Sequence, residues 1–319
     1  MDEKKVIGGY FGLEFDTRSN EYYSNLIKLN SARNAILLAI LERKYSKIYL
    51  PIYNCGVVIS LLKKNGIEVV EYEINDYLEI RDIPVLGKND GLIYTNYFGL
   101  KDNYVQYLSN NIENLIIDNA QAFFSTPLKN IDTVYSPRKF FGVPDGGYLC
   151  SNIQQSKIKL QQDTSIDRFS HLLKRIDLSP ELGYEDFIIN DKSLDNEPIK
   201  KLSLLTEKIL SSNIDYINVK RIRNNNYLYL HKNLSKSNLL NINFNLEASP
   251  MIYPFMSDNQ HLKSYLIKNK IFVATYWPDV LERCKKGSLE ELFTNSVIAL
   301  PIDQRYTIND MDRILSFII

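Results

Sequence analysis

Residues 114–150, NLIIDNAQAFFSTPLKNIDTVYSPRKFFGVPDGGYLC, carry the pattern that decides the fold. Three short apolar runs, NLIID at 114–118, DTVYS at 132–136 and GYLC at 147–150, have the length and composition of buried strands. The first two end at the polar side chains Asp118 and Ser136. We therefore expect consecutive strands that present polar groups where they end.

The same alternation extends toward the N-terminus. KIYL at 47–50, EVVEYE at 68–73 and GLIYTNYF at 91–98 are further candidate strands, and the residues near 55–65 have a helical pattern. Strands that alternate with helices are typical of a mostly parallel sheet covered by helices on both faces. Ligands of such sheets bind beyond the carboxyl ends of the strands, so the chemistry is expected there.

The C-terminal half has a different organisation. Residues 202–234, LSLLTEKILSSNIDYINVKRIRNNNYLYLHKNL, predict one or two long amphipathic helices. After Pro250, MIYPF, KIFVATYW and SVIALP predict short strands, and a helix is expected near 307–318. We therefore expect a large α/β domain over 1–210, and over 211–319 a smaller α/β domain with its connecting helix.

Composition narrows the class of partner. The number of lysine plus arginine residues (38) equals that of aspartate plus glutamate (38). The chain therefore has no net positive charge that would attract nucleic acid or an anionic membrane. Cys55, Cys150 and Cys284 lack the spacing of metal ligands, and no basic-then-apolar leader opens the sequence. The longest apolar run, Ala35–Leu41, is far shorter than the roughly 20 residues of a membrane helix. We expect a soluble cytoplasmic protein without a metal.

Asp118 has two readings. A carboxylate at the end of a buried strand needs a partner, and a pyridinium nitrogen is one, because each group holds the other ionised. A ring kept protonated in this way draws electrons from a substrate carbanion. Alternatively, Asp118 is the N-cap of a helix formed by NAQAF.

Lys139 also has two readings. It follows a candidate strand and precedes aromatic and glycine residues, where a partly desolvated amine could form a Schiff base with an aldehyde. Ser136 could place its hydroxyl on a phosphate of the same ligand, and Gly142, Gly146 and Gly147 could allow backbone to approach it closely. The alternative is a basic loop followed by a Gly-Gly turn.

The two segments together resemble the DegT-type sugar aminotransferases, which are pyridoxal phosphate (PLP) enzymes of the aspartate aminotransferase fold class. The strongest match is DNAQAF at 118–123, followed by a serine, a lysine and DGG at 145–147. Weaker likeness covers nearly the whole chain, in LNSARNAILLAI, YLPIYNCGVVISLLKKNG, YTNYFG, KLSLLTEKIL, IFVATYWP and LPIDQRYTINDMDRI.

The resemblance assigns cofactor roles to individual residues. It implies that Lys139 holds PLP covalently and shuttles protons, that Asp118 pairs with the ring nitrogen, and that Gln121 lies near the ring hydroxyl. Ser136 would bind the phosphate, helped by the backbone of Ser31 and Ala32 at a helix N-terminus.

The resemblance leaves the roles of Tyr53, Cys55 and Arg33 open. Tyr53 or Cys55 would cover one face of the ring. The family has a glycine-threonine pair where this chain has Ser31-Ala32-Arg33, so Arg33 is either a compensating phosphate ligand or a solvated helix residue.

Three more residues are candidate substrate ligands, each with a structural alternative. Arg138 could bind a carboxylate or phosphate bidentately, or form a surface salt bridge. Tyr276, next to Trp277, could line a sugar pocket or belong to the core or an interface. His171 could position a substrate or act as an acid, or lie on a helix surface, and no histidine has the company that metal ligation needs.

The function implied by the resemblance is transfer of an amino group, with glutamate as donor, to a nucleotide-linked keto sugar for surface polysaccharides such as O-antigen. The resemblance also implies a homodimer with its active sites at the interface. One alternative is a PLP-dependent sugar dehydratase, although in this family that reaction goes with loss of the lysine, and Lys139 is present. Another is a non-catalytic relative that acts as a regulator or scaffold.

Overall fold

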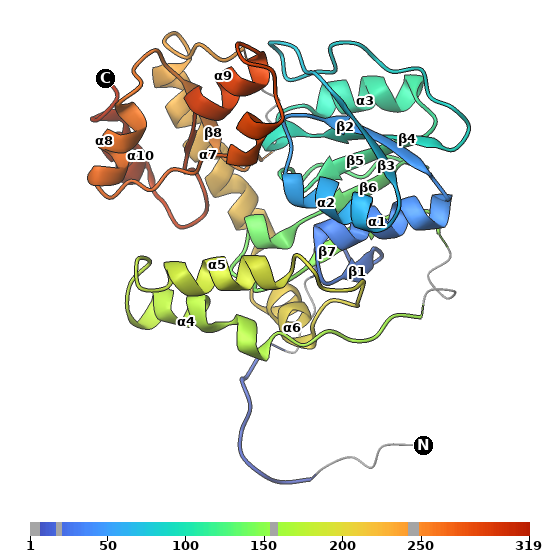
Figure 1. Cartoon of the computed structure of the whole chain (residues 1–319). Helices are drawn as coiled ribbons and strands as arrows, with labels where there is room; N and C mark the ends of the chain where they lie inside the picture. Colours follow the sequence, from blue (N-terminus) through green and yellow to red (C-terminus); the bar gives the residue numbers. More distant parts are fainter. Residues whose placement is uncertain (1–6, 17–20, 154–158, 242–248) are drawn as a thin grey trace.

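A computed structural model describes residues 7–16, 21–153, 159–241 and 249–319, and its core is a seven-stranded sheet (Figure 1). The strands are β1 (Ile27–Leu29), β2 (Lys47–Pro51), β3 (Glu68–Tyr72), β4 (Asp90–Thr95), β5 (Leu115–Asn119), β6 (Asp132–Tyr135) and β7 (Gly147–Cys150). Their order in the sheet is β1-β7-β6-β5-β4-β2-β3. All six strands expected from residues 47 to 150 are present.

The sheet is mostly parallel. The pairs β3–β2, β2–β4, β4–β5 and β5–β6 are parallel, whereas β7 is antiparallel to both β6 and β1. The sequence did not predict β1, because three residues with Lys28 at the centre give no detectable alternation. The strand expected over 91–98 ends at Thr95, since Phe98 takes a left-handed conformation (φ 59°).

The alternation of side chains along the strands builds two different cores. Ile93, Ile116, Val134 and Leu149 face the cluster that contains α1 (Ala32–Arg43) and α2 (Gly56–Lys64). The residues between them, among which are Tyr94, Ile117, Tyr135 and Tyr148, face a second cluster. That second cluster continues without a break into the C-terminal part of the chain.

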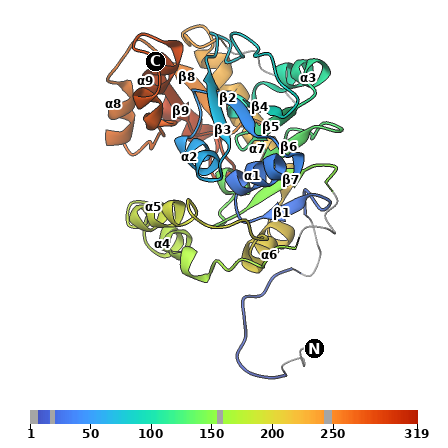
Figure 2. The same ribbon diagram turned by 45° about the vertical axis from the view of Figure 1, so that its right-hand side comes forward.

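Helices dominate the middle of the chain. One or two helices were expected over 202–234, and the structure has two, α6 (Leu204–Ser212) and α7 (Tyr216–Leu234). Helix α3 (Asp102–Asn111) precedes β5. Two further helices, α4 (Ser170–Asp177) and α5 (Tyr184–Ser193), pack on each other. Figures 1 and 2 both show this pair standing outside the helices that cover the sheet.

The C-terminal part is a small α/β unit. Strands β8 (Tyr253–Met256) and β9 (Val297–Leu300) pair antiparallel, and the helices are α8 (Leu262–Lys268), α9 (Leu289–Ser296) and α10 (Ile308–Leu315). The division at residue 210 stays a prediction, since the core of this unit is continuous with one face of the large sheet. None of the helices in the described ranges is long and apolar enough to cross a membrane.

The strand expected over KIFVATYW, 270–277, is wrong. Left-handed residues bound this segment, Lys270 (φ 62°) and Trp277 (φ 53°), and only an isolated bridge joins Ala274 to Ala299. Val273 and Trp277 are buried in the core. The apolar pattern therefore reflects burial of a loop rather than pairing in a sheet.

Candidate active site

A cavity of about 280 Å³ lies at the carboxyl ends of β4, β5 and β6. Its walls also include the start of α1, part of α5 and the segment at 276–277. The residues singled out from the sequence that line it are Ser31, Ala32, Arg33, Cys55, Asp118, Gln121, Ser136, Arg138, Lys139, Gly146, Tyr276 and Trp277. Positions between residues 31 and 277 of the chain are thus brought to one place.

Asp118 lies one residue before the end of β5 and is 5% exposed. One carboxylate oxygen accepts a hydrogen bond of 2.9 Å from the Ala120 N–H. Residues 120–125 form turns, so the alternative of a helix N-cap is wrong, although the carboxylate does cap a turn. Burial raises the pKa of Asp118, opposed by the charge of Lys139. No hydrogen bond from the described residues reaches the second oxygen.

Gln121 presents an unsatisfied donor to the cavity. Its side chain is fully buried, and its Oε1 accepts a hydrogen bond of 2.9 Å from the Phe98 N–H. Its Nε2 is buried and has no partner within the described part of the chain. Leaving a buried N–H group unpaired costs about 1–3 kcal/mol, so an oxygen on a bound ligand would stabilise this arrangement.

The N-terminus of α1 forms another wall. Ser31 is the N-cap, and its Oγ accepts from the Asn34 N–H at 3.2 Å. The first N–H groups of a helix have no partner within the helix, and Ala32 is the first residue of α1, so this end can bind an anion. A Cβ on Gly147 would lie 2.3 Å from the Ser31 carbonyl carbon, so glycine is required for α1 to start this close to β7.

Ser136 and Lys139 bracket a single turn of 3-10 helix, Pro137–Lys139, directly after β6. The turn points Ser136 inward, where it is 6% exposed, and leaves Lys139 exposed. The tight turn carries Lys139 to the rim of the cavity, so the partial desolvation expected of this lysine stays a prediction.

Two arginines are held in the wall by acidic residues of α5 and its C-terminal end. Arg138 forms an ion pair of 3.1 Å with Asp191, and burial lowers the pKa of Arg138. Arg33 pairs with Asp195 and lies 4.0 Å from Asp191. Arg138 therefore forms a salt bridge, although in the cavity wall rather than at the surface, and its role as a substrate ligand stays a prediction. Arg33 is a wall residue rather than a solvated one, its side chain 13% exposed.

Of the two candidates for covering a ligand, Cys55 lines the cavity and Tyr53 does not. Tyr53 is 1% exposed and packs edge-on against Trp277 at 4.8 Å between ring centres. Burial raises the pKa of the Cys55 thiol. Tyr53 thus supports Trp277, which together with Tyr276 forms the wall contributed by the C-terminal unit.

The sequence reasoning missed several wall residues. Asn54 donates a hydrogen bond of 3.2 Å to the Thr95 hydroxyl, and both residues line the cavity, as do Phe187 and Asp191 of α5. Thr95 and Asn54 end or follow a strand, so the same rule that singled out Asp118 could have found them. No signal near Lys139 pointed to α5, which reaches the cavity only through the tertiary fold.

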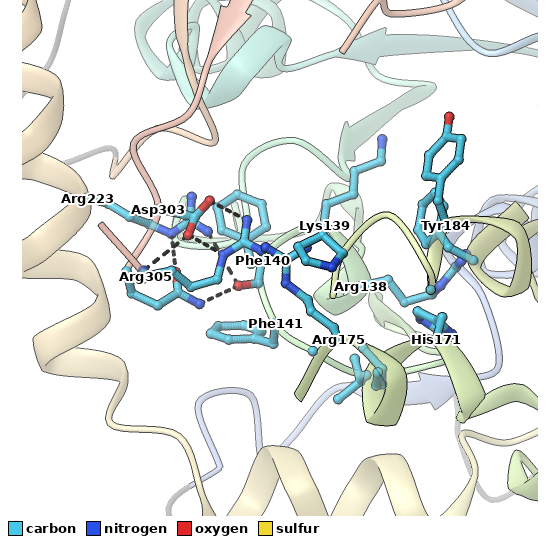
Figure 3. A pocket seen from close by; sticks show the side chains of 17 residues that line it. Arg138, Lys139, Phe140, Phe141, His171, Arg175, Tyr184, Arg223, Asp303 and Arg305 are labelled. Atoms are coloured by element: carbon cyan, nitrogen blue, oxygen red, sulfur yellow. Dashed lines mark hydrogen bonds and ion pairs between the residues drawn. The ribbon is translucent and has the colours of Figure 1, made fainter. Parts of the chain in front are cut away.

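His171 lies outside this cavity. It lines a neighbouring one of about 430 Å³, which shares Arg138, Lys139 and Phe187 with the first (Figure 3). Its ring contacts Phe187 at 5.7 Å, and burial lowers its pKa. In the described ranges, no three His, Cys, Asp or Glu side chains come together as a metal site would require.

No protein-family model matches the sequence, and no curated protein matches it either. Solved structures do. A DegT DnrJ EryC1 StrS aminotransferase from Brucella abortus is similar over 92% of this chain and 84% of its own, with a TM-score of 0.61 and 14% identity. Helicobacter pylori PseC, an aminotransferase involved in the biosynthesis of pseudoaminic acid, is similar over 92% of this chain and 85% of its own, with a TM-score of 0.57 and 14% identity.

A third structure is DesI in the presence of its TDP-sugar product, with a TM-score of 0.61 at 9% identity over 92% of this chain and 79% of that one. Identities of this size show a shared fold. The chain therefore has the aspartate aminotransferase-like fold of these sugar aminotransferases, a mixed seven-stranded sheet flanked by helices.

Proposed function

We propose that this chain is a PLP-dependent aminotransferase. The observation that carries the proposal is that one cavity collects Lys139, the buried carboxylate of Asp118, the hydroxyl of Ser136 and the unpaired amide of Gln121. Each of these groups matches one part of the cofactor, and they come from the ends of two neighbouring strands, β5 and β6, and the turns that follow them. If Lys139 belonged only to a basic surface turn, Asp118, Ser136 and Gln121 would not need to line the same cavity.

The donors and acceptors of the cavity fit PLP. Ser136, Ser31 and the start of α1 would hold its phosphate. Asp118 would accept from the ring N–H with its free oxygen, and Gln121 Nε2 would donate to the ring oxygen. When bound, the cofactor supplies an aldehyde for an amine and a ring that accepts electrons from the carbon that carries the amino group.

The residues of the chain then have defined tasks. The Lys139 amine would tether the cofactor and would move a proton at the reacting carbon. Asp118 keeps its negative charge opposite a cation, which offsets the cost of its burial. The indole of Trp277 and the ring of Tyr276 exclude water from one side.

For substrates we propose glutamate as donor and a nucleotide-linked keto sugar as acceptor, in the biosynthesis of a surface polysaccharide such as O-antigen. Two of the similar structures support this choice, since one contains a TDP-sugar product and the other acts in the biosynthesis of pseudoaminic acid. The cytoplasm is the compartment where such substrates are used.

A homodimer is part of the proposal. Lys139 is exposed in a single copy, whereas a Schiff-base lysine works best when water is excluded. Beside it, α4, α5 and the loop between them expose large apolar side chains, which monomers rarely gather in one place. They are Leu173, Ile176, Leu178, Leu182, Tyr184, Phe187 and Ile189. A second copy would cover these residues and enclose the cavity.

Absorbance spectroscopy tests the proposal. Purified protein given PLP should develop the visible band of lysine-bound cofactor, glutamate should bleach it, and a keto sugar nucleotide should restore it. Lys139→Ala should abolish the band and reduce turnover by a factor of about 10³ or more, because tether and proton carrier are lost together.

Lys208→Ala is the matched control, since Lys208 is an exposed lysine of α6 outside the cavity. It should keep the band and the turnover. Full turnover in Lys139→Ala would refute the proposal. A colourless wild-type protein that ignores PLP would instead favour a non-catalytic relative.

A further inference from the structure

One arginine of the C-terminal unit reaches the large sheet from outside both cavities described above. Arg283 directly follows the short 3-10 helix η5 (Pro278–Glu282), and its side chain is 18% exposed. It lines neither the cavity of about 280 Å³ nor the cavity of about 430 Å³. The proposed amino transfer therefore gives it no contact with cofactor or substrate.

The Arg283 guanidinium holds the turn that follows β2. Its Nη1 donates to the Ile52 carbonyl at 3.1 Å, and its Nη2 donates to the Asn54 carbonyl at 2.7 Å. Nη1 also pairs with Glu71 of β3. The planar fork of an arginine holds several acceptors at once in a fixed geometry, which the single ammonium group of a lysine cannot do. Residues 52–54 are thus fixed from the side of the C-terminal unit.

The same guanidinium holds the segment that carries Tyr276 and Trp277. Nη2 donates to the Asp279 carboxylate at 2.9 Å, two residues after Trp277. We refer to Arg283 and its four partners, Ile52, Asn54, Glu71 and Asp279, as the junction.

Two walls of the candidate active site meet at the junction. Asn54 and Cys55 line the cavity from the turn after β2, and Tyr276 and Trp277 line it from the C-terminal unit. Asn54 and Arg283 are 229 residues apart in the chain, so local structure does not set the separation of the two walls. The bonds of one guanidinium to both segments set it instead.

Gly56 shows how closely the two segments approach. It is the first residue of α2, and a Cβ on it would lie 2.3 Å from Oδ2 of Asp279. The N-cap, Cys55, makes no side-chain cap bond, so the Asp279 carboxylate lies near N–H groups that the helix leaves open, where a negative charge is favourable. Asp279 therefore contacts both Arg283 and the start of α2.

Two further contacts lie beside the junction. Lys285 pairs with Glu73 at 2.6 Å, and the buried Glu290 accepts a hydrogen bond of 2.8 Å from the Ile74 N–H. None of these four residues lines the cavity. They attach residues 285–290 to the chain that follows β3, so the C-terminal unit should stay docked when the Arg283 guanidinium is removed.

We propose that Arg283 is a positioning residue, which keeps the Asn54–Cys55 turn and the Tyr276–Trp277 segment at the separation that excludes water from one side of the cavity. The part that concerns the two walls depends on the chain itself. The part that concerns a lysine-bound cofactor rests on the amino transfer proposed above. Without the guanidinium, the 276–279 segment loses the charged bond that ties it to the turn, and water gains access to the ring of Trp277.

Fluorescence tests the walls without any cofactor, because Trp277 is the single tryptophan of the chain. In PLP-free protein, Arg283→Gln should raise the acrylamide quenching constant about 2-fold or more, since local opening exposes an indole that is now 8% exposed. Arg283→Lys should restore little, because an ammonium group cannot hold the turn and Asp279 together. Arg313→Gln, which removes an exposed arginine of α10 that donates to the Asn269 carbonyl, should be quenched like the wild type.

Gly56→Ala tests the junction from the other side and keeps Arg283. The added Cβ should push Asp279 away, whereas alanine favours a helix more than glycine does, so no large loss of thermal stability is expected. Increased quenching of Trp277 at an unchanged thermal midpoint would support the junction. Wild-type quenching in Arg283→Gln would overturn the proposal, and if that variant does not fold, wild-type quenching in Gly56→Ala would overturn it.

PLP-loaded protein tests the consequence for the cofactor. Hydroxylamine, which releases PLP from a lysine as an oxime, should bleach the visible band of Arg283→Gln about 3-fold or more faster than that of the wild type, because water and small nucleophiles enter. The wavelength of the band should not change, since no cofactor ligand is altered. An unchanged bleaching rate would refute the positioning role. If wild-type protein gives no band with PLP, the amino transfer fails, and the fluorescence of Trp277 still decides whether Arg283 holds the walls.

Discussion

Asp118 shows a conflict between stability and function at the level of one residue. Its carboxylate is buried, and burial raises its pKa, so the folded protein holds the charged form at a cost. Residues kept in such an environment are typical of functional sites, where a ligand supplies the missing partner. The cost of Asp118 is therefore expected to disappear when a cation binds in the cavity.

Asp118→Asn should have opposite effects on stability and on cofactor binding. The amide keeps an oxygen for the Ala120 N–H but carries no charge, so the cofactor-free protein should gain roughly 0.5–2 kcal/mol at pH 7. PLP affinity should fall by about 10-fold or more, because the ring nitrogen loses its anion. Urea unfolding of the cofactor-free protein and PLP titration measure the two quantities.

The pH dependence of stability provides the control for Asp118. A carboxyl group with a raised pKa in the folded state contributes stability below its unfolded value, 3.8, and loses that contribution as the pH rises through the folded pKa. The difference between wild type and Asp118→Asn should therefore grow as the pH is raised from about 4. Equal unfolding free energies at all pH values, with unchanged PLP affinity, would show that Asp118 is only a turn cap.

At the level of elements, the start of α1 depends on β7. The antiparallel strand carries Gly147 at the position where Ser31 passes, and the helix N-terminus with its free N–H groups is placed by that contact. Packing of backbone against backbone leaves no side chain that could move aside. The anion-binding end of α1 is thus positioned by a residue that itself touches no ligand.

Gly147→Ala should disrupt this contact. A methyl group 2.3 Å from the Ser31 carbonyl carbon forces α1 or β7 to shift, at a cost of about 1–3 kcal/mol, and PLP affinity should fall with the displaced N-terminus. Thermal unfolding and PLP titration check both effects. Gly142→Ala is the control, since its Cβ would meet only a Leu172 side-chain carbon at 3.7 Å, and equal behaviour of the two variants would contradict the contact.

At the level of the whole molecule, the loop after Lys139 is tied to the C-terminal unit. Arg223 of α7 and Gln304 both donate to the Phe140 carbonyl, and Arg223 also bonds residues 250 and 251. One buried guanidinium therefore connects the loop after Lys139, helix α7 and the segment that leads into β8. The cavity wall at Tyr276 and Trp277 belongs to that same unit.

The surface of α4 and α5 leads to a prediction about assembly. Ile176 and Ile189 are 80% and 60% exposed, and replacing both with aspartate should dissociate a dimer that buries them. Sedimentation of the double variant should give a monomer with weaker PLP binding. Ile217→Asp, on α7 and 85% exposed, should leave the assembly intact, and a wild-type monomer would refute the dimer.

The sequence alone indicated the α/β class, six of the seven strands of the large sheet and most of the cavity residues. Local chemistry explains this success. Buried parallel strands are short apolar runs, and polar side chains that follow them must meet at one edge of the sheet. Asp118, Ser136 and Lys139 could be singled out because each stands at the end of such a run or within a few residues of it.

Only the tertiary structure decided the rest. It placed Cys55 rather than Tyr53 on the cavity, left Lys139 exposed, moved His171 to a second cavity and turned 270–277 into a buried loop. These outcomes depend on packing between segments far apart in the chain, such as α5 against the Lys139 turn. Hydrophobic periodicity reports that a residue is buried, but the neighbour that buries it is set by the fold as a whole.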